Sequence, residues 1–320
     1  MTLMDTLVSV IIPVYNRAHI VGRTLQSVQE QTYRPLQLIL VDNCSDDDSL
    51  RVIEQFRDDH QAPDFQVEVL QEERHTAGAA RNRGFSAATG LWVLFFDSDD
   101  VMQPGLIQRY MEIVHSCDPK PHIVATKASL VAPDGNSRVL PFHKGDELAN
   151  HLLHAMLATQ RYAVDREFFA AAGGWNPELP GWNDWEMGVR LLLANPTVAY
   201  LEPEQPLVDI YQTGAASITG TEFHTRQGQW ERVIDLLDSE IEASSLENKR
   251  RYHRLLDYRR VVLAAQYRRE GHDELAQPLY RAAYGRLKES ALLRIAIPVL
   301  YKWLVAGRRG ASSMARLLIR

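Results

Sequence analysis

Short apolar runs alternate with helical patterns through the first 126 residues of this chain. The runs are rich in Val, Ile, Leu and Phe, and the segments between them repeat apolar residues at helical spacing, as at Val21, Leu25 and Val28. Such alternation predicts an α/β fold in which a mostly parallel sheet carries helices on both faces. The expected strands cover residues 7–13, 36–42, 65–70, 91–96 and 122–126.

Cap and breaker residues place the expected helices. Ser45 is predicted to cap a helix that runs to about residue 57, and Pro104 to open one that runs toward residue 114. Another helix is expected over residues 184–195. It lies in a less regular stretch, 127–206, and long insertions of this kind often shape substrate pockets.

The length suits an α/β domain followed by a helical extension. The chain has 320 residues, of which 45% are hydrophobic and 24% charged, as in an ordinary globular protein with a large core. We expect the α/β domain over residues 1–222, with halves at 1–101 and 102–222, and a basic helical extension over residues 223–320. Helices of the extension are expected at 227–242, 249–270, 273–289 and 292–320.

The cysteines and the N-terminus indicate a reducing compartment. Cys44 and Cys117 are the two thiols, and their spacing is not that of metal ligands. Met1 leads into no charged and apolar leader of the secretory type. The expected location is therefore the cytoplasm.

Charge is unevenly distributed along the chain. Of the net charge of −6, residues 245–320 contribute +11, with 17 Lys and Arg against 6 Asp and Glu, and the remainder contributes −17. The acidic body argues against a nucleic-acid enzyme. No apolar tract reaches the roughly 20 residues that cross a bilayer, but residues 290–320 have the makeup of an interfacial amphipathic segment. We expect this segment to meet an anionic membrane surface, and packing on its own domain or on a partner is the alternative.

Three carboxylates within four residues follow the apolar run 91–96: Asp97, Asp99 and Asp100. Two carboxylates about 4 Å apart repel by roughly 1 kcal/mol in water and about 4 kcal/mol at a protein surface, so the cluster needs solvent or a cation. A solvated acidic turn is one interpretation. The other is a ligand site, because open α/β sheets bind ligands at their carboxyl edge, and a divalent metal with a phosphate ligand would fit.

Polar motifs also follow the first two strands. Pro13 is expected to end the first strand, because it cannot donate a ladder hydrogen bond, and so to present Tyr15 and Asn16 at the sheet edge. An aromatic face there can stack on a base. Asp42 ends the second strand, where its carboxylate could accept an N–H from that base. A turn or cap role is the alternative for Asp42.

A small-residue segment lies between the third and fourth strands. Gly78 and the alanines after it allow close approach of the backbone, and Arg81 offers a fork of donors to phosphate or to the acidic cluster. A tight helix start with an exposed arginine is the alternative.

In their order, these four motifs resemble the family 2 glycosyltransferases over about residues 6–220. The resemblance implies a GT-A fold, a nucleotide-diphospho-sugar donor and inversion at the sugar's anomeric carbon. It implies that uracil is the base and that Asp99 is the direct ligand of Mn²⁺ or Mg²⁺, ions that prefer hard oxygen ligands. The nucleotide-binding residues that it implies, all in the half 1–101, are Pro13, Tyr15, Asn16, Asp42, Gly78, Arg81 and Asp97.

The segment 180–190 matches the family's acidic pair before a Trp and a helix. Asp184 falls on the position of the catalytic base, whereas Asn183 replaces the usual Glu. A helix cap is the alternative role for Asp184. The glycine pair and aromatic turn at 173–178 resembles the part of the family that closes the pocket. Contacts to the sugar or acceptor are expected from Asp100, Trp175, Trp182, Trp185 and Glu186, with at least one of the tryptophans in the core.

One family feature is missing. Many members carry a metal-binding His after the last strand, and here Gly214 stands in its place. A site without that His must hold its metal through Asp99, the diphosphate and water. His224 lies nearby in the sequence but is not counted as a ligand.

The expected function is transfer of a sugar, from a UDP-sugar, to an acceptor hydroxyl of a cell-surface glycan, polysaccharide or lipid-linked glycan. Expected partners are that donor and acceptor, an anionic membrane on the inner face of the plasma membrane, and a second copy in a homodimer held by the helical extension; no nucleic acid is expected. A nucleotide-sugar-binding pseudoenzyme or scaffold is the first alternative, suggested by Asn183 and Gly214. A sugar nucleotidyltransferase is disfavoured, because no glycine follows the first strand before Gly22.

Overall fold

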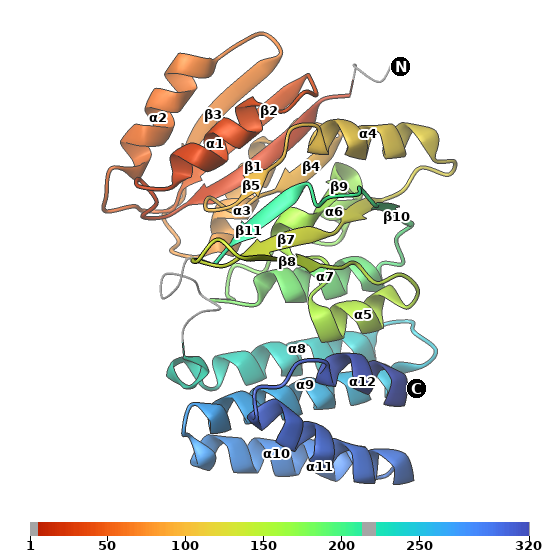
Figure 1. Cartoon of the computed structure of the whole chain (residues 1–320). Helices are drawn as coiled ribbons and strands as arrows, with labels where there is room; N and C mark the ends of the chain where they lie inside the picture. The colour runs from red at the N-terminus through yellow and green to blue at the C-terminus, as the bar shows by residue number, and fades with distance from the viewer. Residues whose placement is uncertain (1–5, 213–221, 320) are drawn as a thin grey trace. The chain divides into compact units, whose positions relative to one another are not determined.

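The computed structural model describes residues 6–212 and 222–319 (Figure 1). It divides into two compact units. The first holds residues up to 142 together with 157–187 and 194–217, and the second holds 143–156, 188–193 and the chain from 218 onward. The boundary at residue 222 thus remains a prediction, because two short segments that precede it group with the helical unit.

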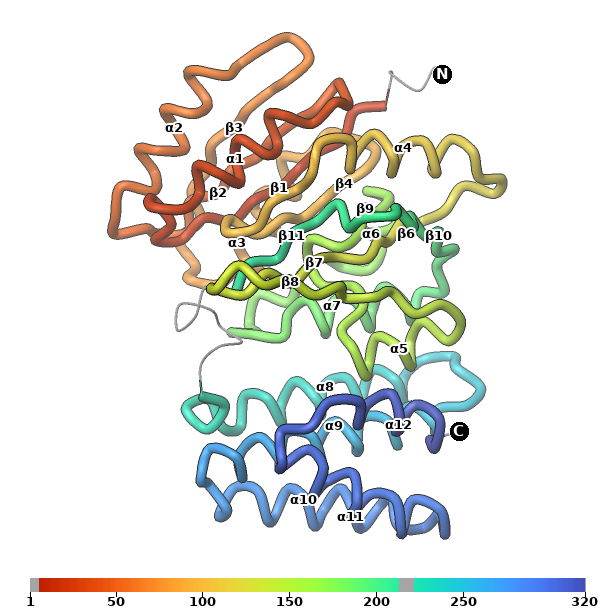
Figure 2. The backbone as a smooth tube through the Cα atoms, in the orientation of Figure 1, coloured from red at the N-terminus to blue at the C-terminus, as the bar shows by residue number. Residues whose placement is uncertain are grey.

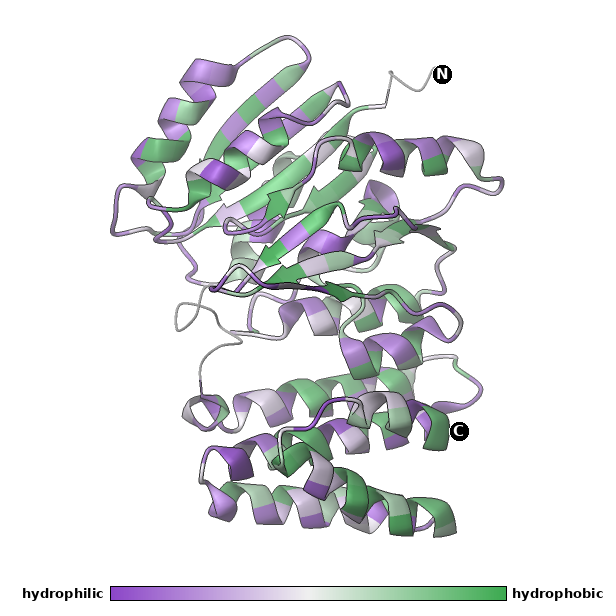
Figure 3. Ribbon diagram, viewed as in Figure 1, coloured by the Kyte–Doolittle hydropathy of each residue, from purple (hydrophilic) through white to green (hydrophobic). Residues whose placement is uncertain are grey.

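A seven-stranded sheet forms the centre of the first unit, in the order β10-β6-β9-β4-β1-β2-β3. Its neighbours are parallel except where β9 runs antiparallel to both β4 and β6. Every residue of β2 is buried, as in a strand covered on both faces, and Figure 3 shows the hydrophobic colouring of these central strands. The strands are β1 Val8–Val14, β2 Leu36–Asp42, β3 Phe65–Gln71, β4 Trp92–Phe95, β6 Ile123–Thr126, β9 Tyr162–Asp165 and β10 Val198–Leu201.

Helices pack against this sheet, and α3 contacts β1, β2 and β3. Helix α3 lies so close to β1 that a Cβ on Gly84 would be 2.5 Å from Cγ2 of Ile11, which is why a glycine is needed there. The mostly parallel α/β class predicted from the alternation of runs is confirmed. The helices of this part of the chain are α1 Val21–Gln29, α2 Ser49–His60, α3 Ala77–Ala87, α4 Leu106–Ser116, α6 Arg166–Ala171 and α7 Asn183–Leu193.

Two predicted helix starts are wrong. Helix α2 begins at Ser49, and Ser45 does not cap it, because the Ser45 hydroxyl instead accepts the backbone N–H of Asn16 at 3.1 Å. Helix α4 begins at Leu106, two residues after Pro104, because Gly105 takes a left-handed conformation (φ 86°) between them.

A second, four-stranded sheet has the order β5-β11-β7-β8. It places β11 antiparallel to β5 and parallel to β7. Strand β5 begins directly after Asp100, so the acidic run connects the two sheets. Its strands are β5 Val101–Met102, β7 Ala128–Val131, β8 Ser137–Leu140 and β11 Val208–Tyr211.

The second unit is helical, and Figure 2 traces its path. Its longest helix, α9, packs against α5, α8, α10 and α11. The tail expected as one segment over 292–320 is two helices, because Gly307 and Gly310 both take positive φ between them. No helix among the described residues is long and apolar enough to cross a bilayer. The helices are α5 Glu147–His154, α8 Gln229–Ala243, α9 Lys249–Arg269, α10 Asp273–Leu287, α11 Ala291–Val305 and α12 Ala311–Leu318.

Candidate active site

The carboxyl ends of β1, β2 and β4 meet at one edge of the large sheet. Val14 of β1 pairs with Asp42 of β2, and Ile11 of β1 pairs with Phe95 of β4, all in parallel register. The polar residues that follow these strands are therefore brought to the same edge, although up to about 80 residues separate them in the chain.

Pro13 does not end its strand, which continues to Val14. The Ile11 carbonyl accepts an N–H from Phe96 on the β4 side, and the Val14 carbonyl accepts one from Asn43 on the β2 side. Because these directions alternate along a strand, the missing N–H of Pro13 points to the β4 side, beyond the last paired residue of β4. The proline therefore costs the ladder no hydrogen bond.

The next two residues form the exposed end of β1. Tyr15 is 48% exposed and meets the His75 ring edge-on, with ring centroids 6.3 Å apart. Asn16 takes a positive φ of 52°, and its Oδ1 accepts the N–H of Asp46 at 2.8 Å. This local geometry leaves the Tyr15 ring available to a ligand while Asn16 holds the backbone.

Asp42 carries an unsatisfied acceptor. The residue is 2% exposed, and its Oδ2 accepts the N–H of Ser45 at 3.3 Å. Its Oδ1 is buried and has no hydrogen-bond partner among the described residues. A buried carboxylate oxygen without a donor is costly, so this atom is ready to accept an N–H from a ligand.

Arg81 links the strand edge to the start of α7. Its Nη2 donates to Oδ1 of Asp97 at 2.6 Å, and its Nη1 donates to Oδ1 of Asn183 at 3.4 Å. The guanidinium carbon lies 4.7 Å from the centre of the Trp175 ring. The Nε of Arg81 is buried and has no partner in the part of the chain that the structure describes. The Arg81 guanidinium therefore contacts residues from three segments, and its Nε remains available to donate a hydrogen bond to a ligand.

Asp184 lies half-buried in the first turn of α7, where its Oδ1 accepts the N–H of Trp185 at 2.8 Å. Burial raises the pKa of Asp184, the Arg81 charge opposes that shift, and the Asp97 charge adds to it. Helix α7 begins at Asn183, so Asp184 is inside the helix and not at its cap position. Burial thus makes the Asp184 carboxyl group more basic than an exposed Asp, although the Arg81 charge works against that shift.

Two arginines reach Asp99, Arg17 from the loop after β1 and Arg23 from α1. Nη2 of Arg17 lies 3.9 Å from Oδ2 of Asp99, and Nη2 of Arg23 donates to the Asp99 carbonyl. Arg23 also lies over the Tyr211 ring, 3.7 Å from its centre. The sequence analysis did not single out these arginines; their position just after β1, opposite the acidic run, is the signal that could have found them.

The donor chemistry fits a divalent cation held jointly with a substrate. Asp97 and Asp99 offer hard carboxylate oxygens at the sheet edge, and their side chains are 32% and 20% exposed. Over residues 6–212 and 222–319, no group of three or more His, Cys, Asp or Glu side chains converges as a metal site. Substrate oxygens and water would therefore have to complete the coordination shell.

Asp100 is structural, contrary to the expected sugar contact. It is 2% exposed, and its two carboxylate oxygens accept the Tyr211 N–H, at 2.8 Å, and the Gln160 amide. Its carbonyl accepts the Thr24 hydroxyl at 2.7 Å. Burial, followed by the Asp97 and Asp99 charges, raises the pKa of Asp100 well above its usual range. The acidic run therefore ends in an anchor that ties α1, the 3-10 turn at 159–161 and β11 together.

Three other expected sugar contacts are also buried. Trp175, Trp185 and Glu186 are 1–2% exposed, so they offer no face on which a sugar could stack. Trp175 packs edge-on against Phe95, with ring centroids 5.1 Å apart. Trp182 is partly exposed, takes a φ of 54° and meets the Trp185 ring edge-on. Of these residues, Trp182 alone remains an expected sugar contact.

Gly78 has no side chain because the backbone of a neighbouring segment lies against it. A Cβ at residue 78 would lie 2.8 Å from the backbone oxygen of Asn176, and the neighbouring Thr76 hydroxyl donates to the Pro177 carbonyl at 2.9 Å. The expected close approach of a nucleotide is therefore not the reason for this glycine. Gly214, which takes the place of the family's metal-binding His, lies outside the described residues. His224 pairs with Glu270 and Glu222 in the helical unit.

The residues that form this edge of the sheet match a known protein family. The family model for glycosyl transferase family 2 matches residues 9–127, which span β1 to β6 and include the acidic run. Residues 9–127 are therefore similar to a family 2 glycosyltransferase domain. An uncharacterized glycosyltransferase of Nostoc sp. is 35% identical over 154 residues, which are 48% of this chain and 46% of that protein.

Other relatives agree with this assignment. TuaG of Bacillus subtilis, provisionally named a teichuronic acid biosynthesis glycosyltransferase, is 30% identical over 172 residues, 52% of this chain and 65% of that protein. GlyG of Streptococcus pneumoniae is 33% identical over 116 residues, 36% of this chain and 37% of that protein. The chain thus spans between a third and two thirds of the length of these relatives.

Solved structures extend the fold likeness to the whole chain. TarS 1-349 of S. aureus in complex with UDP matches with a TM-score of 0.70 at 19% identity, over 97% of this chain and 91% of that one. The mannosyltransferase PcManGT of Pyrobaculum calidifontis, in complex with GDP-Man and Mn²⁺, matches with a TM-score of 0.56 at 18% identity, over 97% and 86%. The expected GT-A fold with its C-terminal helices is confirmed.

Proposed function

We propose that this family 2 domain transfers a sugar from a uridine diphosphate sugar to an acceptor hydroxyl, with inversion at the anomeric carbon. The observation that carries the proposal is the cluster around Arg81, which joins Asp97, at the strand edge, to the turn that bears Asp184. A single displacement requires stabilisation of the charge on the leaving diphosphate and a base for the proton of the acceptor hydroxyl.

The uridine preference follows from the β1 and β2 ends. Tyr15 offers an exposed ring for stacking, and the partnerless Oδ1 of Asp42 offers an acceptor for the imide N–H of uracil. TarS, which shares the fold, has been crystallised with UDP and with UDP-GlcNAc, and this supports the same nucleotide class.

Asp184 is the proposed general base. Its carboxylate takes the proton of the acceptor hydroxyl as the oxygen attacks the anomeric carbon, and the bond from that carbon to the diphosphate oxygen breaks. Burial raises the pKa of Asp184, which makes it a stronger base than an ordinary aspartate, and the Arg81 charge opposes that rise. The Arg81 Nε is the donor left over for the departing phosphate.

Asp97 and Asp99 are the residues that would hold Mn²⁺ or Mg²⁺. When bound, such an ion neutralises charge on the leaving diphosphate. With Gly214 in place of the family's His, the substrate supplies more of the coordination shell than in His-bearing members. TuaG, the relative named for teichuronic acid biosynthesis, supports a glycan acceptor.

A panel of nucleotide sugars, with Mn²⁺, Mg²⁺ or a chelator, tests this function by direct binding and by slow donor hydrolysis. We expect UDP-sugars to bind and to be hydrolysed, and Asp184→Asn to bind them normally without hydrolysis. Binding without hydrolysis by the unaltered chain would favour the pseudoenzyme. Absence of nucleotide binding under every metal condition would reject the proposal altogether.

A further inference from the structure

Helix α11 has apolar side chains on two sides. One side is buried in the helical unit, and the other is exposed. Leu293, Ile297 and Leu300 are buried, with 2% exposure or less. Leu292, Ile295 and Val299 are 54%, 73% and 55% exposed. Their spacing of three and four residues puts them on one side of the helix, away from the buried residues. An exposed apolar stripe of this kind on a folded chain marks an interaction surface.

Basic residues continue the stripe. Lys302 is exposed and lies seven residues after Ile295, on the same side of α11. Trp303 follows at four residues from Val299, and the guanidinium carbon of Arg308 lies 5.3 Å from the centre of its ring. The indole N–H of Trp303 donates to the Arg309 carbonyl at 2.9 Å, which folds the turn after α11 back on the helix end. We call Leu292, Ile295, Val299, Lys302 and Trp303 the α11 face.

The surrounding sequence has one sign of charge. Residues 290–320 contain six arginines and lysines and no aspartate or glutamate. Next to the stripe, Lys302, Arg308 and Arg309 are exposed. Figure 3 shows hydrophobic colouring along α11 with hydrophilic residues between. Apolar side chains flanked by cations and an aromatic ring are the composition of helices that lie in a membrane interface.

We propose that the α11 face docks on an anionic lipid bilayer. The apolar side chains enter the boundary between head groups and acyl chains, and Lys302, Arg308 and Arg309 contact lipid phosphates. This binding requires no donor, acceptor or transfer, so it stands or falls separately from the proposed reaction.

A second copy of the chain fits this face less well. In a two-fold dimer the α11 face would meet itself, and Lys302 and Arg308 would lie near their own copies without an acid in the segment to offset them. Among the described residues, exposed large apolar side chains outside residues 290–320 are Tyr15 after β1, Leu91 before β4 and Val139 in β8. None of these forms a stripe that could cover α11.

Flotation of the full chain with vesicles tests the proposal. Vesicles of phosphatidylcholine with phosphatidylglycerol should carry the chain upward at low salt, whereas pure phosphatidylcholine vesicles should carry far less. Ile295→Ser with Val299→Ser should weaken partitioning about tenfold or more, because two apolar side chains leave the interface. Lys302→Glu with Arg309→Glu should weaken it by a similar factor and reduce its salt dependence.

Matched controls use exposed apolar and basic positions elsewhere in the chain. Leu91→Ser with Val139→Ser, and Arg51→Glu with Arg250→Glu, should float like the unaltered chain. Circular dichroism and melting of every variant separate loss of binding from loss of folding. The proposal is overturned by flotation that the α11 variants leave unchanged, or by no flotation of the unaltered chain. Sedimentation in which the apolar pair of substitutions dissociates an oligomer would assign the face to a second copy and also overturn it.

Discussion

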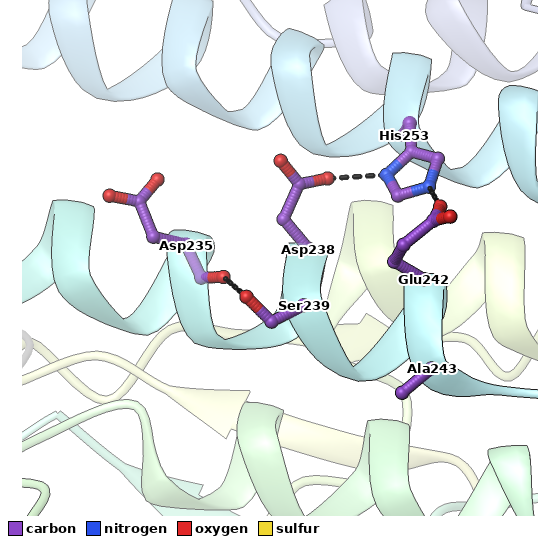
Figure 4. Close-up of a pocket in the computed structure, with 6 residues that line it drawn as sticks. All are labelled: Asp235, Asp238, Ser239, Glu242, Ala243 and His253. Carbon is purple, nitrogen blue, oxygen red and sulfur yellow. Dashed lines mark hydrogen bonds and ion pairs between the residues drawn. The ribbon is translucent and has the colours of Figure 1, made fainter.

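The strand edge and the pocket between α8 and α9 both gather carboxylates and cations, but they differ in how these groups are paired. The α8–α9 pocket has a volume of about 610 Å³ and is lined by acids and one histidine (Figure 4). His253 lies between Asp238 and Glu242, at 2.5 and 3.0 Å, and Arg260 pairs with Asp235 and Asp238. At the strand edge, Oδ1 of Asp42 and Nε of Arg81 have no partner among the described residues.

This difference in pairing indicates that the strand edge, and not the α8–α9 pocket, is the binding site. Side chains that satisfy one another stabilise helix packing and leave little for a ligand, whatever the volume beside them. Buried polar atoms without partners are costly to the fold, and at a binding site the ligand offsets that cost. The predictions below set one region against the other.

The largest expected effect is on turnover. Asp184→Asn should lower turnover by about 10²-fold or more, because the hydroxyl proton then has no base, and should leave nucleotide affinity near normal. Steady-state kinetics and calorimetric titration with a UDP-sugar measure the two quantities. Asp238→Asn in the α8–α9 pocket is the matched control and should keep full turnover. Equal losses in both variants would remove the distinction between the regions.

The second effect is on stability. The Arg260 side chain is 7% exposed and donates to Asp257, which is equally buried, as well as to Asp235 and Asp238. Arg260→Met should lower the free energy of unfolding by about 2 kcal/mol, less than for an isolated buried pair, because Arg286 still contacts Asp257. Urea denaturation measures the change. A variant as stable as the unaltered chain would show that this network adds nothing to the packing of α8, α9 and α10.

The third effect is on nucleotide affinity. Asp42→Asn removes the charge from the partnerless acceptor and should weaken UDP binding about tenfold, with a smaller change for nucleotides whose base lacks the imide N–H. Titration with UDP and CDP compares them. If UDP and CDP weaken equally, Asp42 does not contact the base.

The smallest effect is a displacement of the pH profile. Asp184 must be ionised to accept a proton, so kcat/KM should fall as the pH drops through its pKa, and burial places that fall at a higher pH than for an exposed Asp. The Arg81 charge lowers the same pKa, so Arg81→Gln should move the fall to still higher pH. A profile that moves to lower pH, or does not move, would separate Arg81 from Asp184.

The sequence predicts β1, β2, β3, β4 and β6 of the large sheet, where apolar runs and turn residues decide local structure, but not β9, β10 or the four-stranded sheet, which lie in or next to the less regular stretch. The strand over 36–42 has the observed bounds of β2, and the start of α9 at Lys249 is also as predicted. The errors at Ser45 and Pro104 have one cause: hydrogen bonds from distant residues and a left-handed glycine outweigh local capping preference. The same limit applies to α11 and α12, where two glycines divide what periodicity joins.

The sequence could not predict which of the expected site residues are buried and which are exposed. The acidic run looks uniform as letters, yet Asp97 and Asp99 are partly exposed while Asp100 is enclosed by Tyr211 and Gln160, which come from far along the chain. The tryptophans divide in the same way, with Trp175 in the core and Trp182 partly exposed. Which member of a motif faces solvent depends on contacts between distant segments, and a single sequence does not record them.

The uncharged Asn183 amide affects how strongly the Arg81 cluster attracts the diphosphate of the proposed donor. The guanidinium of Arg81 meets a full negative charge at Asp97 and only a dipole at Asn183, so the cleft opposes an arriving diphosphate less than one with a glutamate at 183 would. The same charge balance would help to hold the nucleotide that the proposed reaction releases.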